Sequence, residues 1–236
     1  MKSSFEWISI SDMFAGIMMV FLLLAITFMF ITQNQSKALI KKNQELSVLN
    51  DHMSEILKAY SDLQLNINND LVREFSGDFS KWNASIDDTN TIRFNELDSI
   101  FEIGKSDIKD DFKVILDDFF PRYMKIINKY RDDIEEIIIE GHASNIWRGA
   151  NNINDSFLYN ATLSQNRALN VMRYCFLNNT KNDEKEWLMK VLHSNGMSFS
   201  RPLESEEKSR RVEFRVTTKA YNSIKEVIDL EVLKLE

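Results

Sequence analysis

A run of about 20 uncharged residues near the amino terminus limits what this chain can fold into, because it matches the hydrocarbon thickness of a bilayer. Residues 13–32 read MFAGIMMVFLLLAITFMFIT. A signal peptide has a shorter apolar core, of about 7–15 residues, followed by a small-residue cleavage site. This run ends instead in large residues, from Phe28 to Ile31. We therefore expect an uncleaved transmembrane helix over residues 13–32.

Asp12 directly precedes this apolar segment. A carboxylate at the edge of a membrane helix, or inside it, costs free energy and usually faces a protein interior or a water-filled path. The alternative is a capping role, because Ser11 and Asp12 are both good N-cap residues and acids suit helix N-termini. The position of Asp12 alone does not decide between a carboxylate that faces a protein interior or water-filled path and one that caps the helix. The hydroxyl of Thr27 is expected to bond back to its own helix.

Charges on the two sides of the segment give a weak indication of its orientation. Lys2 stands on the amino-terminal side, and Lys37, Lys41 and Lys42 follow the segment closely. Since Lys and Arg are enriched in cytoplasmic loops, this count weakly favours a cytoplasmic carboxyl-terminal side.

Composition restricts the rest of the chain. Of the 236 residues, roughly 200 follow the span, which is enough for one compact domain and a connector. The net charge of −7 argues against a nucleic-acid-binding surface. A single cysteine, Cys175, excludes an internal disulfide and is expected to be a small core residue. His52 and His193 are far apart in sequence, and we expect neither a zinc site nor a cofactor.

A helical connector is expected over residues 36–75, with a reach of about 60 Å at 1.5 Å per residue. Apolar residues recur in alternating steps of three and four, at Leu46, Leu49, Met53, Ile56, Tyr60, Leu63 and Ile67. This heptad seam is typical of a two-stranded coiled coil, and Leu71 and Phe75 continue the stripe until Ser76-Gly77. The alternative is an amphipathic helix that packs on its own domain. The position of the seam just outside the membrane favours a dimeric stalk.

Strand and helix patterns alternate from about residue 91. Strands are expected at 92–94, 135–140 and 211–216, and amphipathic helices at 107–130, with Pro121 breaking or kinking the first, and at 163–176. This order predicts a two-layer α/β sandwich, so the whole chain is expected to be of the α+β class.

Three blocks in the second half resemble the OmpA-like peptidoglycan-binding domain in order and spacing. They read IIIEGHAS from Ile137, YNATLSQNRALNVMRYCF from Tyr159 and SRRVEFRV from Ser209. The segment FEIGKSDI from Phe101 is similar to the family's Phe-x-x-Gly-Ser segment. The resemblance covers residues 90–220 and leaves 221–236 as a tail.

The resemblance places Tyr159, Asn160, Leu163 and Arg167 at a peptidoglycan-binding site. A guanidinium such as that of Arg167 can hold a stem-peptide carboxylate bidentately. The family's aspartate after the Gly-His pair falls on Ser144, so Asn145 or Asp155 is a candidate substitute. His142 matches the motif and is expected to be structural.

The membrane segment resembles that of the MotB family of stator proteins. The stretch WISISDMFAGIMMVFLLLAITFM, the stalk and the OmpA-like domain together carry this likeness. Only 11 residues precede Asp12, which is more similar to the MotB-like subunits of Zorya anti-phage defence than to flagellar stators.

The resemblance implies a non-enzymatic, proton-driven motor subunit in the bacterial inner membrane. Residues 1–12 would then be cytoplasmic and residues after about 33 periplasmic, against the weak lysine count. It implies a homodimer surrounded by five copies of a channel subunit of the MotA/ZorA class, with Asp12 as the proton carrier. A flagellar stator and a static peptidoglycan tether remain the alternatives.

Overall fold

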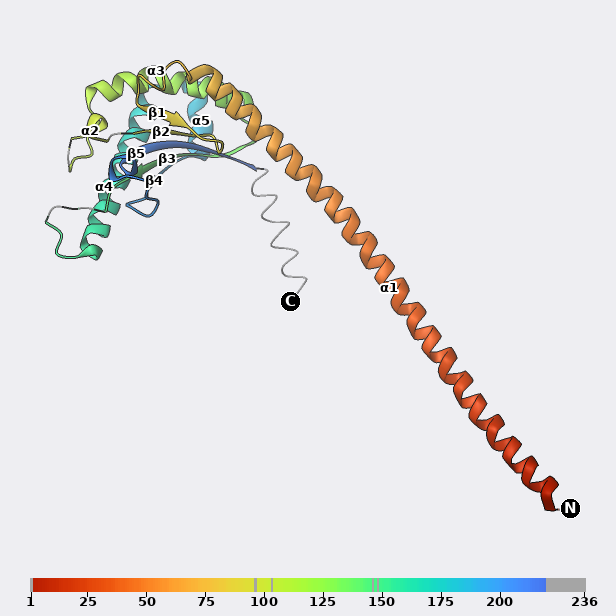
Figure 1. Ribbon diagram of the computed structural model, residues 1–236. Helices are drawn as coiled ribbons and strands as arrows, with labels where there is room; N and C mark the ends of the chain where they lie inside the picture. The colour runs from red at the N-terminus through yellow and green to blue at the C-terminus, as the bar shows by residue number, and fades with distance from the viewer. Residues whose placement is uncertain (1, 96, 103, 146, 148, 220–236) are drawn as a thin grey trace. The chain divides into compact units, whose positions relative to one another are not determined.

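The computed structural model describes residues 2–219 apart from positions 96, 103, 146 and 148, and describes side chains from Ser11 onward apart from residues 97 and 98. The tail expected at 221–236 lies outside the described residues. The chain divides into two compact units, Met1–Glu55 and Ile56–Glu236. The described part of the first unit is a single helix, α1 (Lys2–Phe75), which continues into the second unit (Figure 1).

Helix α1 begins at Lys2, ten residues before Asp12. The capping alternative for Asp12 is therefore wrong, because an N-cap residue precedes the first helical turn and has a non-helical backbone. With no proline and a single glycine, Gly16, nothing in the sequence interrupts the helix before it ends at Phe75. The Thr27 hydroxyl donates to the carbonyls of Leu23 and Leu24 at 2.9 Å, as expected.

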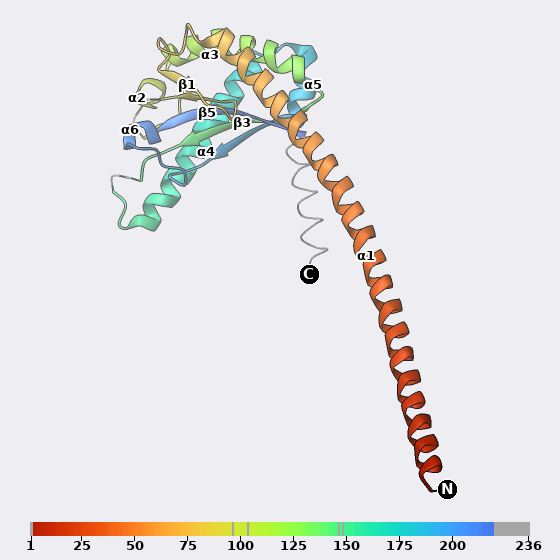
Figure 2. The same ribbon diagram turned by 45° about the vertical axis from the view of Figure 1, so that its right-hand side comes forward.

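The second unit contains a five-stranded sheet in the order β1-β2-β5-β3-β4 (Figure 1 and Figure 2). The strands are β1 (Ala84–Ile86), β2 (Thr91–Phe94), β3 (Ile134–His142), β4 (Leu192–Gly196) and β5 (Arg211–Thr218). Neighbouring strands are antiparallel except β3 and β4, which run parallel. The three expected strands are present, and β1 and β4 are additional.

The main helices of this unit are α3 (Asp110–Ile127), α4 (Ile153–Asn178) and α5 (Asn182–Val191). Two short helices, α2 (Leu97–Ile100) and α6 (Glu206–Ser209), and a 3₁₀ turn, η1 (Asn128–Tyr130), complete it. Pro121 lies inside α3 without ending it. Helix α4 starts ten residues earlier than expected, because the Asn152 side chain caps it by accepting from the Asp155 N–H.

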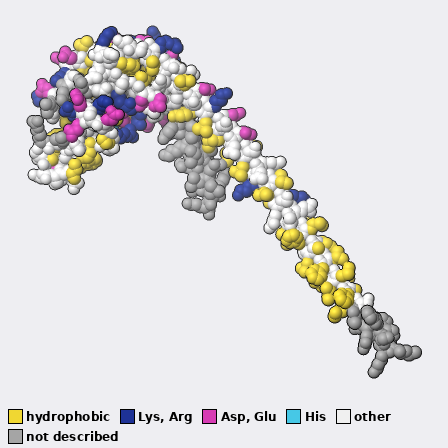
Figure 3. All heavy atoms as spheres, in the orientation of Figure 1, with side chains coloured by type: hydrophobic (Ala, Val, Ile, Leu, Met, Phe, Trp, Pro, Cys, Tyr) yellow, Lys and Arg dark blue, Asp and Glu magenta, His cyan; other side chains and the backbone are white. Residues whose placement is uncertain are grey.

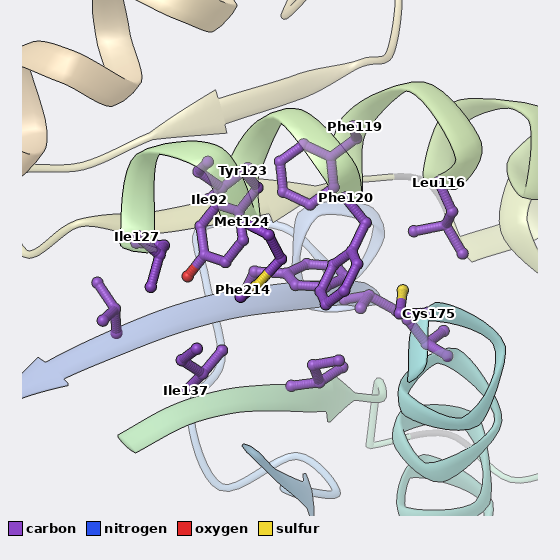
Figure 4. Close-up of a cluster of buried hydrophobic side chains, with 14 of the residues drawn as sticks. Ile92, Leu116, Phe119, Phe120, Tyr123, Met124, Ile127, Ile137, Cys175 and Phe214 are labelled. Atoms are coloured by element: carbon purple, nitrogen blue, oxygen red, sulfur yellow. The ribbon is translucent and has the colours of Figure 1, made fainter. Parts of the chain in front are cut away.

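Both α3 and α4 cover the same face of the sheet, so the expected two-layer α+β arrangement is confirmed. Phe119 of α3 packs on Phe214 of β5, with ring centroids 5.0 Å apart (Figure 4). Beside Phe214 on this face lie Ile139 and Gly141 of β3, and a Cβ on Gly141 would come within 2.3 Å of the Ser164 carbonyl of α4. Glycine at this position therefore lets α4 approach the sheet closely. Cys175 is fully buried in this core, as predicted, and burial raises the pKa of its thiol.

The last turns of α1 belong to the core of the second unit. Ile67, Leu71 and Phe75 are all 0% exposed. Arg122 of α3 donates to the Glu74 carboxylate at 2.8 Å and lies 4.9 Å from the centroid of the Phe75 ring. These residues cannot also form a coiled-coil seam, so the seam prediction is wrong at Ile67 and beyond. There the alternative, packing on the chain's own domain, is correct, and a seam over the earlier positions stays a prediction.

Candidate functional site

The apolar part of α1 is fully open in this chain. Its large side chains between Met13 and Ile31 are 43–72% exposed, and Figure 3 shows them as a continuous apolar stretch. This helix is long and apolar enough to cross a membrane. Asp12 lies one residue before this stretch, exposed and within the helix. A carboxylate thus stands at the edge of an exposed apolar helical surface.

The second candidate site is built around the amino-terminal half of α4. Asn160 and Arg167 lie on the buried face of this helix, at 3% and 6% exposure, whereas Tyr159 is 48% exposed and Leu163 is half-buried. The four residues predicted for peptidoglycan binding therefore lie on one helix but in two different environments.

Arg167 holds the segment that precedes α3. Its Nε donates to the Lys105 carbonyl at 2.9 Å, and a terminal nitrogen donates to the Glu102 carbonyl at 3.4 Å. The guanidinium lies 4.9 Å from the centroid of the Phe101 ring, and one turn further along α4 Asn170 donates to the Ser106 carbonyl at 2.8 Å. The segment similar to the family's Phe-x-x-Gly-Ser is thus fixed against α4 by Arg167.

Asn160 supports the loop that follows β3. Its amide donates to the Ser156 hydroxyl at 3.4 Å, and this hydroxyl donates to the Asn145 carbonyl at 2.8 Å. Ser144 and Asn145 line a cleft of about 330 Å³, together with Phe199 and Leu203. Asp155, the other candidate for replacing the family's aspartate, accepts from the Asn152 side chain at 3.2 Å and belongs to the cap of α4.

The sequence interpretation missed Trp147. Its ring lies against that of Tyr159, with centroids 5.3 Å apart and planes tilted by 35°. Trp147 is half-buried and Tyr159 is nearly half exposed, so the pair presents aromatic surface to solvent. A tryptophan in a loop otherwise rich in Asn was the available signal, because tryptophan is enriched at binding interfaces.

A buried charge network occupies the sheet face opposite the helices. Glu140 of β3 is paired directly with Glu213 of β5, an arrangement of like charges that is unfavourable by itself. Arginines offset it: Glu213 accepts from Arg93 at 2.8 Å and from Arg211 at 2.6 Å. Glu140 accepts from Arg215 and, at 3.3 Å, from Arg201.

Burial by itself would raise the pKa of both carboxyls, but neighbouring positive charge outweighs it. His142, whose Nε2 lies 3.5 Å from the Glu213 carboxylate, and Arg211 together hold the pKa of Glu213 far below its usual range. The pKa of Glu140 is likewise lowered, through His142, Arg215 and Arg201. His142 itself is 1% exposed and lies within the network, as expected of a structural histidine.

Glu140, His142 and Glu213 also place ligand atoms within 4.8 Å of one another, close enough for a metal ion. Each carboxylate is already bound by two arginines, so a cation there would be opposed by four guanidinium groups. The donor set therefore fits an ion-pair network better than a metal centre.

The described residues define a chain with one candidate membrane helix and a mixed α/β domain. No protein-family model matches the chain. Among solved structures, a MotB-like protein from Desulfovibrio vulgaris is similar to it, with 20% identity, a TM-score of 0.48, and coverage of 71% of this chain and 96% of that one. The cell wall anchor of the T6SS from Pseudomonas aeruginosa is 19% identical, with a TM-score of 0.43 and coverage of 63% and 97%.

A curated relative defines the family more closely. Zorya protein ZorB of Escherichia coli strain ATCC 8739 is 34% identical over 230 residues, which cover 94% of this chain and 92% of the relative. At that identity and coverage, the chain belongs to the ZorB family.

Proposed function

We propose that this chain is the wall-anchored subunit of a proton-driven motor in the bacterial inner membrane, and that it acts in anti-phage defence. Membership of the ZorB family supports the defence role. The observation that carries the motor role is Asp12, an exposed carboxylate inside a helix and directly before its uncharged apolar stretch. We place the amino terminus in the cytoplasm and the second unit in the periplasm.

Asp12 is the proton carrier in this proposal. Because α1 begins at Lys2, Asp12 is not its N-cap residue. Intramembrane acids of this kind line ion paths, and each proton that crosses 100 mV releases about 2.3 kcal/mol. Two copies of this chain, surrounded by five channel subunits of the MotA/ZorA class, would use that free energy to turn the ring around the anchored dimer.

The α4 site binds peptidoglycan in this proposal. Tyr159 and Leu163 supply the accessible surface, and Trp147 extends it. Arg167 and Asn160 are buried, and they contribute mainly by holding the neighbouring loops in place through hydrogen bonds. Replacing all four by Ala would therefore unfold the loops as well as remove contacts, so surface variants give the cleaner test.

Binding of the chain to purified sacculi tests the wall site. Trp147→Ala and Tyr159→Ala should each reduce the bound fraction. Leu158→Ala is the matched control, because Leu158 is 62% exposed on the same helix turn and lies beside Tyr159 in sequence. If the Trp147 and Tyr159 variants fold normally and bind sacculi as well as the wild type does, peptidoglycan binds to another surface of the chain.

Phage challenge tests the defence role. The chain is expressed with its neighbouring genes in a sensitive host, as wild type and as Asp12→Asn. We expect fewer plaques with the wild type than with an empty vector, and as many plaques with Asp12→Asn as with the empty vector. Equal plaque counts for wild type and empty vector, with rescue of a non-motile stator mutant, would favour a flagellar role. Protection by Asp12→Asn equal to that of the wild type would favour a static tether.

A further inference from the structure

The cleft lined by Ser144 and Glu206, which we call the Ser144–Glu206 cleft, has an unbalanced charge. Its volume of about 330 Å³ is within the range of small-ligand pockets. Glu204 and Glu206 are the charged side chains among its described lining residues. The Glu204 carboxylate is paired with the Lys208 ammonium at 2.9 Å, whereas the Glu206 carboxylate has no partner within the described part of the chain. The cleft therefore contains one uncompensated negative charge.

Arginines that are close in sequence do not neutralise this charge. Arg201, Arg210 and Arg211 do not line the cleft. Arg201 donates to Glu140 at 3.3 Å, and Arg211 donates to Glu213 at 2.6 Å. Both of these guanidinium groups are thus held in the buried charge network of the sheet.

Apolar side chains line the same cleft. Ile153 and Leu203 are 61% and 39% exposed. The half-buried Phe199 packs edge-on against Phe157, with ring centroids 5.4 Å apart. An alkyl chain that ends in an ammonium group suits such a lining, because its methylene groups cover apolar surface while its charged end stays near water. The lining therefore fits a ligand that has an amine on a methylene chain.

Two polar side chains from the loop after β3 complete the lining. Ser144 and Asn145 offer a hydroxyl and an amide, and neither side chain has a hydrogen-bond partner among the residues that the structure describes. Both groups can donate to, and accept from, the peptide groups of a ligand. The loop itself is fixed, because the Ser156 hydroxyl donates to the Asn145 carbonyl at 2.8 Å and the Ala143 N–H donates to the Ser198 carbonyl at 2.7 Å. The cleft is thus preorganised for a ligand with peptide groups.

The Ser144–Glu206 cleft adjoins the aromatic pair of the proposed wall site. Trp147 follows Asn145 by two residues in the same loop, so their backbones are at most about 7 Å apart. A single polymer can therefore contact both the aromatic pair and the cleft.

We propose that the Ser144–Glu206 cleft binds a stem peptide of peptidoglycan, with the Glu206 carboxylate paired to a free ammonium group at the end of a peptide side chain. Ser144 and Asn145 form hydrogen bonds with the amide groups of this peptide. The inference rests on the proposed wall binding and adds the chemical group that is recognised and the residue that recognises it.

Binding of the full-length chain, in detergent, to chemically modified sacculi tests this ion pair. Mild N-acetylation converts the free ammonium groups of the stem peptides into neutral amides, whereas reductive methylation adds bulk and keeps the charge. The variant is Glu206→Gln. The matched control is Glu207→Gln, because Glu207 is exposed in the same short helix and does not line the cleft. Circular dichroism melts check that both variants are folded.

We expect wild type and Glu207→Gln to bind native and methylated sacculi alike. Both should bind acetylated sacculi about fivefold more weakly, the upper end for a solvent-accessible ion pair. Glu206→Gln should bind all three kinds of sacculi with this weaker affinity. Undiminished binding of Glu206→Gln to native sacculi would overturn the proposal, as would an equal loss with Glu207→Gln. A further loss for Glu206→Gln on acetylated sacculi would also overturn it, because the ammonium would then be recognised elsewhere.

The same titrations separate this inference from wall binding itself. If Trp147→Ala weakens binding to native sacculi and Glu206→Gln does not, the stem-peptide assignment fails while wall binding stands. If the wild type does not bind native sacculi, both proposals fail.

Discussion

Tyr159 and Asn160 are neighbours on α4, yet one faces solvent and the other lies inside the domain. A motif assigns both residues to a ligand in the same way, because sequence adjacency carries no information about which side chain a loop covers. The difference follows from the 100° turn between successive helical residues, which sends Asn160 and Arg167 toward the loops and leaves Tyr159 at the edge. The motif predicts that both residues belong to one binding site, and the geometry shows that only Tyr159 is accessible there.

Arg167→Lys should destabilise the domain although it preserves the charge. Lysine has no planar fork to reach the carbonyls of Lys105 and Glu102 together while lying over Phe101. We expect a loss of about 1–3 kcal/mol in the free energy of unfolding, from hydrogen bonds to a buried charged group. Urea unfolding measures it, with Arg173→Lys, exposed on the same helix, as control. Equal stability of the two variants would contradict a loop-holding role.

Glu213→Gln should reveal the strength of the charge network. Removing the carboxylate charge leaves Arg93 and Arg211 without their buried partner, a change that costs about 3–5 kcal/mol at neutral pH. Because the folded-state pKa of Glu213 is lowered, its contribution is fully present above the unfolded pKa near 4.5 and diminishes as the pH falls below it.

The measurement is urea unfolding of wild type and Glu213→Gln at a series of pH values. We expect a gap between the two proteins that is constant near neutral pH and narrows below about pH 4.5. Glu206→Gln, at an exposed position of α6, should show almost no gap. A gap that widens on acidification would contradict the lowered pKa of Glu213.

At the scale of elements, the long periodic segments were predictable and the short ones were not. The strands β3 and β5 have the apolar content and alternation that are typical of strands, and α3 has a clear amphipathic pattern. The strand β4, with the sequence Leu-His-Ser-Asn-Gly, has few residues that favour strands and exists because it pairs in parallel with β3. A strand that forms through tertiary pairing of this kind has no strand pattern in its own sequence.

Helix α1 illustrates the same limit in another way. Its apolar stripe continues without a break from Leu46 to Phe75, but the stripe serves the domain core from Ile67 onward. A heptad pattern fixes which face is apolar and says nothing about what covers that face. Only the structure assigns the end of the stripe to α3 and the sheet.

Fragment boundaries test this assignment. A fragment of residues 56–236 should fold, whereas one of residues 77–236 should lose most of its stability. The shorter fragment lacks Ile67, Leu71 and Phe75, and burial of such side chains contributes about 1.5–3 kcal/mol each. Their sum is comparable to the whole stability of an ordinary domain, about 5–15 kcal/mol. Circular dichroism melts compare the two, and a cooperative, equally stable 77–236 fragment would contradict the shared core.

At the scale of the whole molecule, one uninterrupted helix contains both the proposed proton carrier and residues of the proposed wall-binding domain's core. Asp12 and Phe75 belong to the same backbone hydrogen-bonded element, although they serve opposite ends of the proposed mechanism. The proposed motor role requires that Asp12 titrates during function.

Proton flux through the assembled complex is the most direct measurement. The chain and its channel partner are reconstituted together in vesicles with a pH-sensitive dye inside, as wild type, Asp12→Asn and Asp12→Glu. Asparagine preserves size but cannot titrate, whereas glutamate retains the carboxyl. We predict flux in the wild type, measurable residual flux with Asp12→Glu, and none with Asp12→Asn in complexes of unchanged composition. Full flux through the Asp12→Asn complex would contradict the proposed role of Asp12 as proton carrier.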